Sequence, residues 1–281
     1  MGLLWQPNED VFFFKVFSLN LISSELVTKR CICSDIAKLY DPIGWLDPIV
    51  IRVKVLIKNL WIRGDGSDDS LPKELQQSSL SFKKQLADIE YIKIPCCAGS
   101  FSSSSWMLHC FCDASERDAA AIYVVIQNKD QISVKLPTAK AEVAPIKSLS
   151  FPRFELCSAV ISAKLAAYIL NKLDRPPLEI HCWSDSKVAL AWIQAHQSKY
   201  KTFISHRVTE ITGLLPGLIG DMFSLLTTQQ IWLRVEKHLL NSGSLAFGRK
   251  AQFGWHYHRL AGPRYLAFLI ILKKHEILIG L

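Results

Sequence analysis

The sequence predicts an α/β fold in which a sheet is covered by helices. Two short apolar runs, each typical of a buried strand, end in an acidic residue, Asp113 in the first and Asp185 in the second. Between them, Glu155 opens a long pattern that is typical of a helix. Because ligands usually bind at the carboxyl ends of strands in such sheets, the three acids are expected to converge at one site.

The first part of the chain, residues 1–98, is predicted to be a mostly helical connection region. It begins with a strand pair around Leu3 to Phe17, and Asp41 to Gly44 form a loop. A polar linker around Asp65 to Ser70 precedes the last helix. The expected helices are Cys33 to Tyr40, Pro48 to Leu60 and Lys73 to Asp88. The serine-rich segment Gly99 to Ser105 then marks a domain boundary.

The second part, residues 104–211, is predicted to hold the sheet. Its strands are recognised by apolar and β-branched residues between turn signals. Four strands are expected: Leu108 to Asp113, Ala119 to Gln127, Ile132 to Ala139 and Glu179 to Ser184. A fifth strand, which would complete this sheet, is expected to be absent. Residues 212–281 are predicted to be a poorly folded tail.

Two helices are predicted to accompany the acids. On the first, the small residues Ala159, Ser162 and Ala166 share a face with Glu155, which would let the helix lie close to a sheet. A bulky stripe adjoins that face: Phe154, Cys157, Ile161, Leu165 and Tyr168. On the second, which Asp185 or Ser186 can cap, the expected apolar face is Val188, Ala189, Trp192 and Ile193.

The three carboxylates suggest a metal site, because converging carboxylates repel one another unless a cation neutralises them. Oxygen ligands favour hard ions, so the expected partner is Mg²⁺ or Mn²⁺. Two of the acids also have a simpler interpretation. Asp185 at a strand end can be an ordinary helix cap, and Glu155 in a first turn can merely answer the helix dipole.

Several segments together resemble the polymerase polyprotein of BEL/Pao-type LTR retrotransposons, from the end of the reverse transcriptase through the connection segment to the ribonuclease H domain. The resemblance covers about Met1 to Ile211, in the family's order. The segments that carry it are TKRCICSDIAKLYDPIGWLDPIVIRVKVLIKNLW, FCDASERDAAAIYVV, LPTAKAEVAPIK, PRFELCSAVISAKLA, CWSDSKVALAWI and YKTFISHRVTEI.

This resemblance implies a ribonuclease H-like mixed sheet of five strands, with Asp113, Glu155 and Asp185 as catalytic and metal-binding residues. The implied reaction is two-metal hydrolysis of RNA in an RNA/DNA hybrid, so the hybrid is the expected partner. The family is also described as a peptidase. No Asp-Thr-Gly or Asp-Ser-Gly motif supports that activity here, and Gly64 to Ser67 is predicted to be a surface turn.

The fourth acid of the family's site is missing at its expected place. After Ile211 the family pattern continues with Trp-Arg-His-Val and then Asn-Pro-Ala-Asp-Leu-Ala-Ser-Arg-Gly, neither of which is present. If the last base of each codon is read with the first two bases of the next, codons permitted for Thr227 to Val235 can spell Asn-Pro-Ala-Asp-Leu-Ala-Ser-Arg-Gly. In the same shifted frame, Ile219 to Phe223 can spell Trp-Arg-His-Val. We therefore infer a frameshift between Ile211 and Ile219.

The missing acid makes an inactive fragment of the polyprotein the favoured interpretation of this chain. The alternatives are an active ribonuclease H, in which Asp221 becomes the candidate fourth ligand, and a non-catalytic nucleic-acid-binding or interaction module reused by a host. The formal charge of +8 adds little support for nucleic-acid binding. Residues 212–281 supply five of these charges, because they contain eight basic and three acidic residues.

The start of the chain and its cysteines predict an intracellular protein that is neither secreted nor transmembrane. No small-molecule cofactor is expected. Glu9 and Asp10 interrupt the start of the chain, so no secretory signal is expected. The eight cysteines lack Cys-x₂-Cys spacing and are expected to be free thiols rather than zinc ligands. His181 on a strand is expected to be structural, and His196 and His206 to be solvated. The basic residues Lys199, Lys201 and Arg207 could contact phosphates or merely face solvent.

Overall fold

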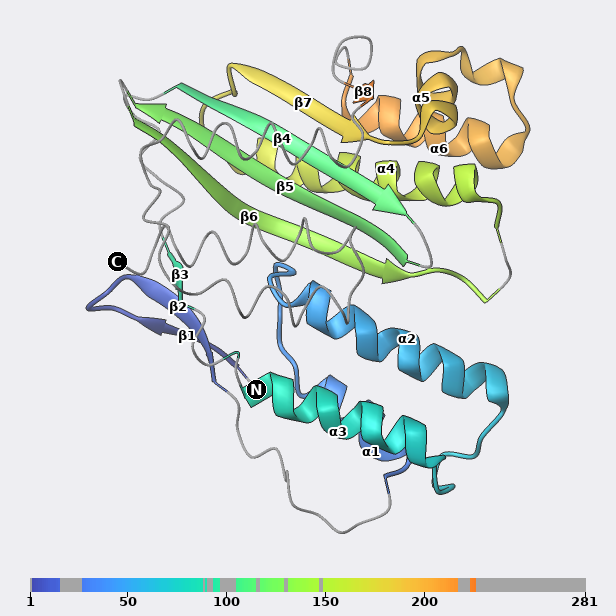
Figure 1. The fold of residues 1–281 in the computed structure, drawn as a ribbon. Coiled ribbons are helices and arrows are strands. Elements are labelled where there is room, and N and C mark those ends of the chain that lie inside the picture. Colours follow the sequence, from blue (N-terminus) through green and yellow to red (C-terminus); the bar gives the residue numbers. More distant parts are fainter. Residues whose placement is uncertain are drawn as a thin grey trace. The chain divides into compact units, whose positions relative to one another are not determined.

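A computed structural model describes residues 2–15, 27–87, 89, 93–96, 105–114, 117–128, 131–146, 149–216 and 223–225 of the chain. These residues divide into two compact units, one within Met1–Cys97 and the other within Ala98–Lys274. Both units combine helices and strands (Figure 1). The predicted α/β class is therefore confirmed.

The first unit contains a small antiparallel sheet and three helices. Strands β1 (Gly2–Gln6) and β2 (Val11–Lys15) form the predicted pair. A third strand, β3 (Lys93–Pro95), pairs with the far side of β2 and was not predicted. The helices are α1 (Lys29–Ala37), α2 (Asp47–Arg63) and α3 (Lys73–Ala87).

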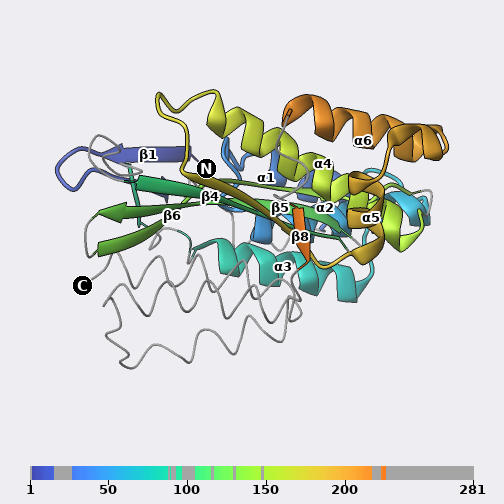
Figure 2. The same cartoon turned by 90° about the horizontal axis from the view of Figure 1, so that it is seen from above.

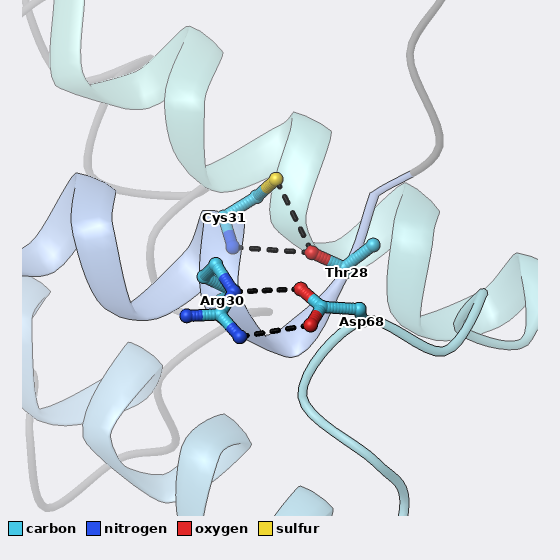
Figure 3. A network of polar contacts seen from close by, with 4 residues as sticks. All are labelled: Thr28, Arg30, Cys31 and Asp68. Carbon is cyan, nitrogen blue, oxygen red and sulfur yellow. Dashed lines mark hydrogen bonds and ion pairs between the residues drawn. The ribbon is translucent and has the colours of Figure 1, made fainter.

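Helix α1 begins at Lys29, four residues before its predicted start at Cys33, and a threonine cap fixes this start. The Thr28 hydroxyl accepts a hydrogen bond from the Cys31 backbone N–H at 3.3 Å (Figure 3). Beside this cap, the Arg30 guanidinium binds both oxygens of Asp68 at 2.6 and 2.8 Å (Figure 3). Both side chains of this pair are largely exposed, so solvent screens it and it contributes little to stability.

The loop before α2 is organised by the carboxylate of Asp41. It accepts hydrogen bonds from the backbone N–H groups of Gly44, Trp45 and Leu46 at 3.0, 3.0 and 2.6 Å. Burial raises the pKa of Asp41, and this effect exceeds the lowering caused by these backbone donors. The predicted loop at Asp41 to Gly44 thus leads directly into α2, which ends at Gly64 in the left-handed conformation with φ of 77°.

The second unit is built on a mixed five-stranded sheet of order β6-β5-β4-β7-β8. Strands β6, β5 and β4 are antiparallel neighbours, and β7 and β8 continue the sheet in parallel to β4. The bounds are β4 (Ser105–Ala114), β5 (Arg117–Asn128), β6 (Gln131–Val143), β7 (Glu179–Ser184) and β8 (Phe223–Leu225). All four predicted strands are present, and β7 has the predicted limits.

The expected absence of the fifth strand is wrong. Strand β8 pairs in parallel with β7, with Phe223 opposite Cys182 and Leu225 opposite Ser184. Backbone pairing depends little on side-chain identity, so a three-residue segment can occupy this edge without the family's Trp-Arg-His-Val sequence. Some residues after Ile211 therefore take part in the described fold. Asp221 lies outside the described residues, as do residues 226–281.

Three helices cover one face of this sheet: α4 (Phe151–Leu170), α5 (Lys187–Gln194) and α6 (Thr202–Leu214). Figure 2 shows α4 and α6 lying side by side along the sheet. The hydrophobic core between these layers includes Trp106 and Leu108 of β4, Leu156 of α4 and Ile211 of α6. Leu215, just beyond α6, is also buried in this core.

The helix faces agree with the predictions except at two positions. The small residues Ala159, Ser162 and Ala166 are fully buried, which confirms the face that lets α4 approach the sheet. Tyr168, predicted in the bulky stripe, is 53% exposed because it lies on the outer edge of α4. Val188 of α5 is also exposed, and Leu190 is buried instead. The buried residues Ala189, Leu190 and Ile193 define the core face of α5, and Val188 lies beside that face.

Candidate metal centre

Three elements each place one carboxylate at the candidate site. Asp113 is the penultimate residue of β4, and Asp185 directly follows β7. Glu155 is the fifth residue of α4, on the side of the helix that faces the sheet. The sequence predicted these three residues as the ligands, and the structure brings all three together.

The strand register explains why the two aspartates meet. Strands β4 and β7 run in parallel, and their last paired positions are Phe111 and Trp183. Asp113 and Asp185 each lie two residues further along, so both occupy the same carboxyl edge of the sheet. The order of the strands thus makes neighbours of residues that are far apart in sequence.

Glu155 reaches this edge because α4 packs tightly on β4 and β5. The fully buried Ala159 of α4 contributes to the core with Cys110 and Cys112 of β4, and an alanine keeps the two backbones close. The Glu155 side chain is itself buried, with an exposed fraction of 8%. A buried carboxylate needs a compensating charge or hydrogen bonds, and a bound cation would supply that charge.

The three carboxylates each offer an oxygen atom, and these oxygens all lie within 4.8 Å of one another. Neighbouring ligands of an octahedral Mg²⁺ are about 3.0 Å apart, because its ligand distance is about 2.1 Å. Side-chain shifts of about 1 Å would therefore bring the three oxygens around one ion. The all-oxygen donor set matches Mg²⁺ or Mn²⁺.

The simpler interpretation of Asp185 as a helix cap does not apply. Helix α5 is capped by the next residue, Ser186, whose hydroxyl accepts a hydrogen bond from the Ala189 N–H at 3.1 Å. The Ser184 hydroxyl accepts another from the Ser186 N–H at 3.2 Å. These two serines shape the turn, and Asp185 Oδ1 is buried without a hydrogen-bond partner among the described residues. The Asp185 carboxylate is therefore not used as the cap of α5.

The helix-dipole interpretation of Glu155 is also wrong. Helix α4 begins at Phe151, and no acidic residue lies in its first turn. The interaction of a carboxylate with the helix dipole weakens beyond that turn. The dipole therefore does not account for a buried Glu155 at this position.

The histidines named from the sequence lie elsewhere. His181 is on β7 and its Nε2 is 2.8 Å from Glu179 Oε2, while the His196 ring contacts the Ser198 hydroxyl. His206 is exposed on α6. Among the described residues, the metal-capable group consists of the three acids alone.

His109 was not singled out by the sequence and lies on the same strand as Asp113, four residues before it. It alternates with Phe111 and Asp113 along β4 and therefore shares their face of the sheet. Its ring stacks on His181 with centroids 4.9 Å apart, and its Nδ1 accepts a hydrogen bond from Trp183 Nε1 at 3.3 Å.

The cysteines near the site behave as buried hydrophobic residues. Cys110 and Cys182 face each other across β4 and β7 and are fully buried, as predicted for thiols inside strands. Two effects raise the pKa of Cys110 well above its usual value: the larger is its hydrogen bond with Cys182, and the second is burial. Burial likewise raises the pKa of Cys112. The Cys110 and Cys112 thiols therefore stay protonated and unreactive at neutral pH.

The difference in burial among the cysteines predicts two classes of thiol in the folded protein. Cys31 and Cys96 are exposed and are expected to react with a disulfide reagent at pH 8 at least about 100 times faster than the buried Cys110, Cys112 and Cys182. Peptide mapping after a short pulse of labelling measures the difference. Unfolding in guanidinium should make the two classes equal. Rapid labelling of Cys110 in the folded state would contradict the described core.

The chain matches a known family model over a range that contains the candidate site. The family model described as Pao retrotransposon-like RNaseH-like domain matches residues 28–186, more than half of the chain, and this range includes all three carboxylates. A comparison with curated proteins finds no match. Within the described residues, no helix is both long enough and apolar enough to cross a membrane.

Proposed function

Because the chain belongs to the Pao retrotransposon-like RNaseH-like domain family, we propose that its carboxylate cluster is a ribonuclease H-type metal site. In this proposal Asp113, Glu155 and Asp185 bind Mg²⁺ or Mn²⁺, and the substrate is the RNA strand of an RNA/DNA hybrid. The observation that carries it is the convergence of three carboxylate oxygens within 4.8 Å of one another. The polyprotein origin of the chain is part of the same proposal.

The residues have distinct roles in this proposal. Asp113 and Asp185 come from the ends of adjacent strands and hold the cation at a fixed position on the sheet edge. Glu155 approaches from the covering helix and closes the ligand set. A bound divalent cation would supply charge stabilisation at the phosphate and an activated water. The protein reads the hybrid by its shape and its 2′-hydroxyl groups rather than by its base sequence.

A second candidate function is favoured by the sequence after Ile211. The Asn-Pro-Ala-Asp motif that would carry the fourth acid is missing there. With three carboxylates, one of two metal positions lacks a ligand, and hydrolysis should be slow although metal and hybrid still bind. In this form the chain is a catalytically impaired fragment that retains the binding functions of the domain.

A cleavage assay distinguishes the two functions. The full-length chain is incubated with a hybrid whose RNA strand is labelled, with Mg²⁺, with Mn²⁺, or with EDTA. An active enzyme should cleave only with metal, and Asp113→Asn should reduce the rate by at least about 100-fold. The impaired form should show no cleavage above that of Asp113→Asn, and yet bind the hybrid. If the chain neither cleaves nor binds the hybrid, both proposals fail.

A further inference from the structure

Two arginines from different helices meet at one aromatic ring, on the side of α4 that faces α6. The Arg207 guanidinium carbon lies 3.5 Å from the Phe203 ring centroid, and that of Arg153 lies 5.1 Å from it. The two guanidinium carbons are therefore at most 8.6 Å apart. Arg153 belongs to the first turn of α4, and Phe203 to the first turn of α6.

The Arg207 side chain is held in place by further contacts. Its Nε donates to Cys157 Sγ at 3.3 Å and its Nη1 donates to the Phe203 carbonyl at 3.2 Å. Stacking on Phe203 fixes the plane of the guanidinium. Its Nη2 donors have no partner among the described residues. One edge of the Arg207 guanidinium is therefore held in place to bind an acceptor from another molecule.

No carboxylate neutralises this pair within the described part of the chain. Further along the same contact between α4 and α6, Glu210 pairs with Lys164 at 2.8 Å. Glu155 is only two residues from Arg153, but two residues correspond to about 200° of helix rotation, so it points toward the sheet instead. Two unpaired like charges held near one ring raise the local positive potential, and an anion would relieve this repulsion.

We propose that Arg153 and Arg207 together hold a phosphate of the nucleic-acid backbone. The identification of this anion rests on the proposed function. Guanidinium groups bind phosphate oxygens through paired, charge-assisted hydrogen bonds. The pair lies at the same end of α4 as Glu155, so a strand held there passes the carboxylate end of the helix. The exposed Lys199 and Lys201, just before α6, extend the same positive surface.

The test is hybrid binding by the full-length chain in EDTA, where metal-dependent cleavage is absent. Fluorescence anisotropy with a labelled RNA/DNA hybrid is measured at several salt concentrations for Arg153→Gln and Arg207→Gln. Each substitution should weaken binding by roughly 5- to 10-fold at about 0.1 M salt and reduce the slope of log affinity against log salt by about 1. Arg→Lys at either position should recover part of the affinity, because the charge remains.

Lys164→Gln is the matched control, since it removes a positive charge on the same contact that is already paired with Glu210. It should change the affinity less than about 2-fold. Equal losses for Lys164→Gln and Arg207→Gln, or an unchanged salt slope in both arginine variants, would overturn the proposal. Arg153→Gln keeps the test decisive if Arg207→Gln unfolds the protein. Arginine-dependent binding by a chain that does not cleave the hybrid in Mg²⁺ or Mn²⁺ would count against the active enzyme and leave the phosphate contact in place.

Discussion

Replacing Asp185 with asparagine is expected to have opposite effects on stability with and without a divalent metal. In EDTA the three carboxylates repel one another across less than 4.8 Å, so Asp185→Asn should stabilise the folded protein by about 1 kcal/mol. With Mn²⁺ at about 100 times its dissociation constant, the unmodified protein should gain about 2.7 kcal/mol. The variant should gain less than about 0.5 kcal/mol, because it lacks one ligand.

Thermal unfolding of both proteins in EDTA and in Mn²⁺ measures these four stabilities. Asp174→Asn is a suitable control, since Asp174 lies in the turn after α4 and outside the carboxylate group. It should respond to Mn²⁺ like the unmodified protein. A destabilised Asp185→Asn in EDTA would show that Asp185 has a structural role instead, and an unchanged Mn²⁺ response would remove it from the site.

Restoring the family's reading frame should strongly increase cleavage of the hybrid. The nucleotide sequence across residues 205–256 should spell Asn-Pro-Ala-Asp-Leu-Ala-Ser-Arg-Gly in the shifted frame. A chain carrying this shifted sequence after Ile219 gains the fourth carboxylate, and its hybrid cleavage should exceed that of the present chain by at least about 100-fold. A full set of ligands fixes both metal positions, which is the physical reason for the increase.

The matched control is the same restored chain with Asn-Pro-Ala-Asn in place of Asn-Pro-Ala-Asp, which should lose the gain. If the codons do not permit the shifted motif, the frameshift hypothesis is wrong and residues 212–281 are authentic sequence. Asp221 then becomes the candidate fourth ligand, and Asp221→Asn replaces the restored chain in the assay. Cleavage by the unmodified chain at the restored rate would contradict the impaired form of the proposal.

The sequence was sufficient to predict the parts of the fold with strong local patterns. Strand β7 has the limits expected from its apolar run between turn residues, and the small face of α4 is buried as its spacing implied. The three acids could be named because each occupies a recognisable position at a strand end or near a helix start. The pairing of β4 with β7, which places Asp113 beside Asp185, depends on strand order, which local sequence patterns do not specify.

The errors arose where the structure depends on distant contacts. Strand β3 forms by pairing with β2, roughly eighty residues earlier in the chain, and its three residues carry no strand pattern of their own. Strand β8 was missed for the same reason, because an edge position can be filled through backbone hydrogen bonds alone. The arginine pair at Phe203 depends on how α4 packs on α6, which periodicity does not specify.

Calorimetric titration of the full-length chain with Mn²⁺, repeated with Glu155→Gln, measures whether the three carboxylates bind a divalent cation. We expect saturable binding to the unmodified protein and a loss of at least about 10-fold in affinity for the variant, because Glu155 is proposed to contribute a ligand from α4. Binding of equal affinity in both proteins, or no binding to the unmodified protein, would show that the three carboxylates do not form a metal site.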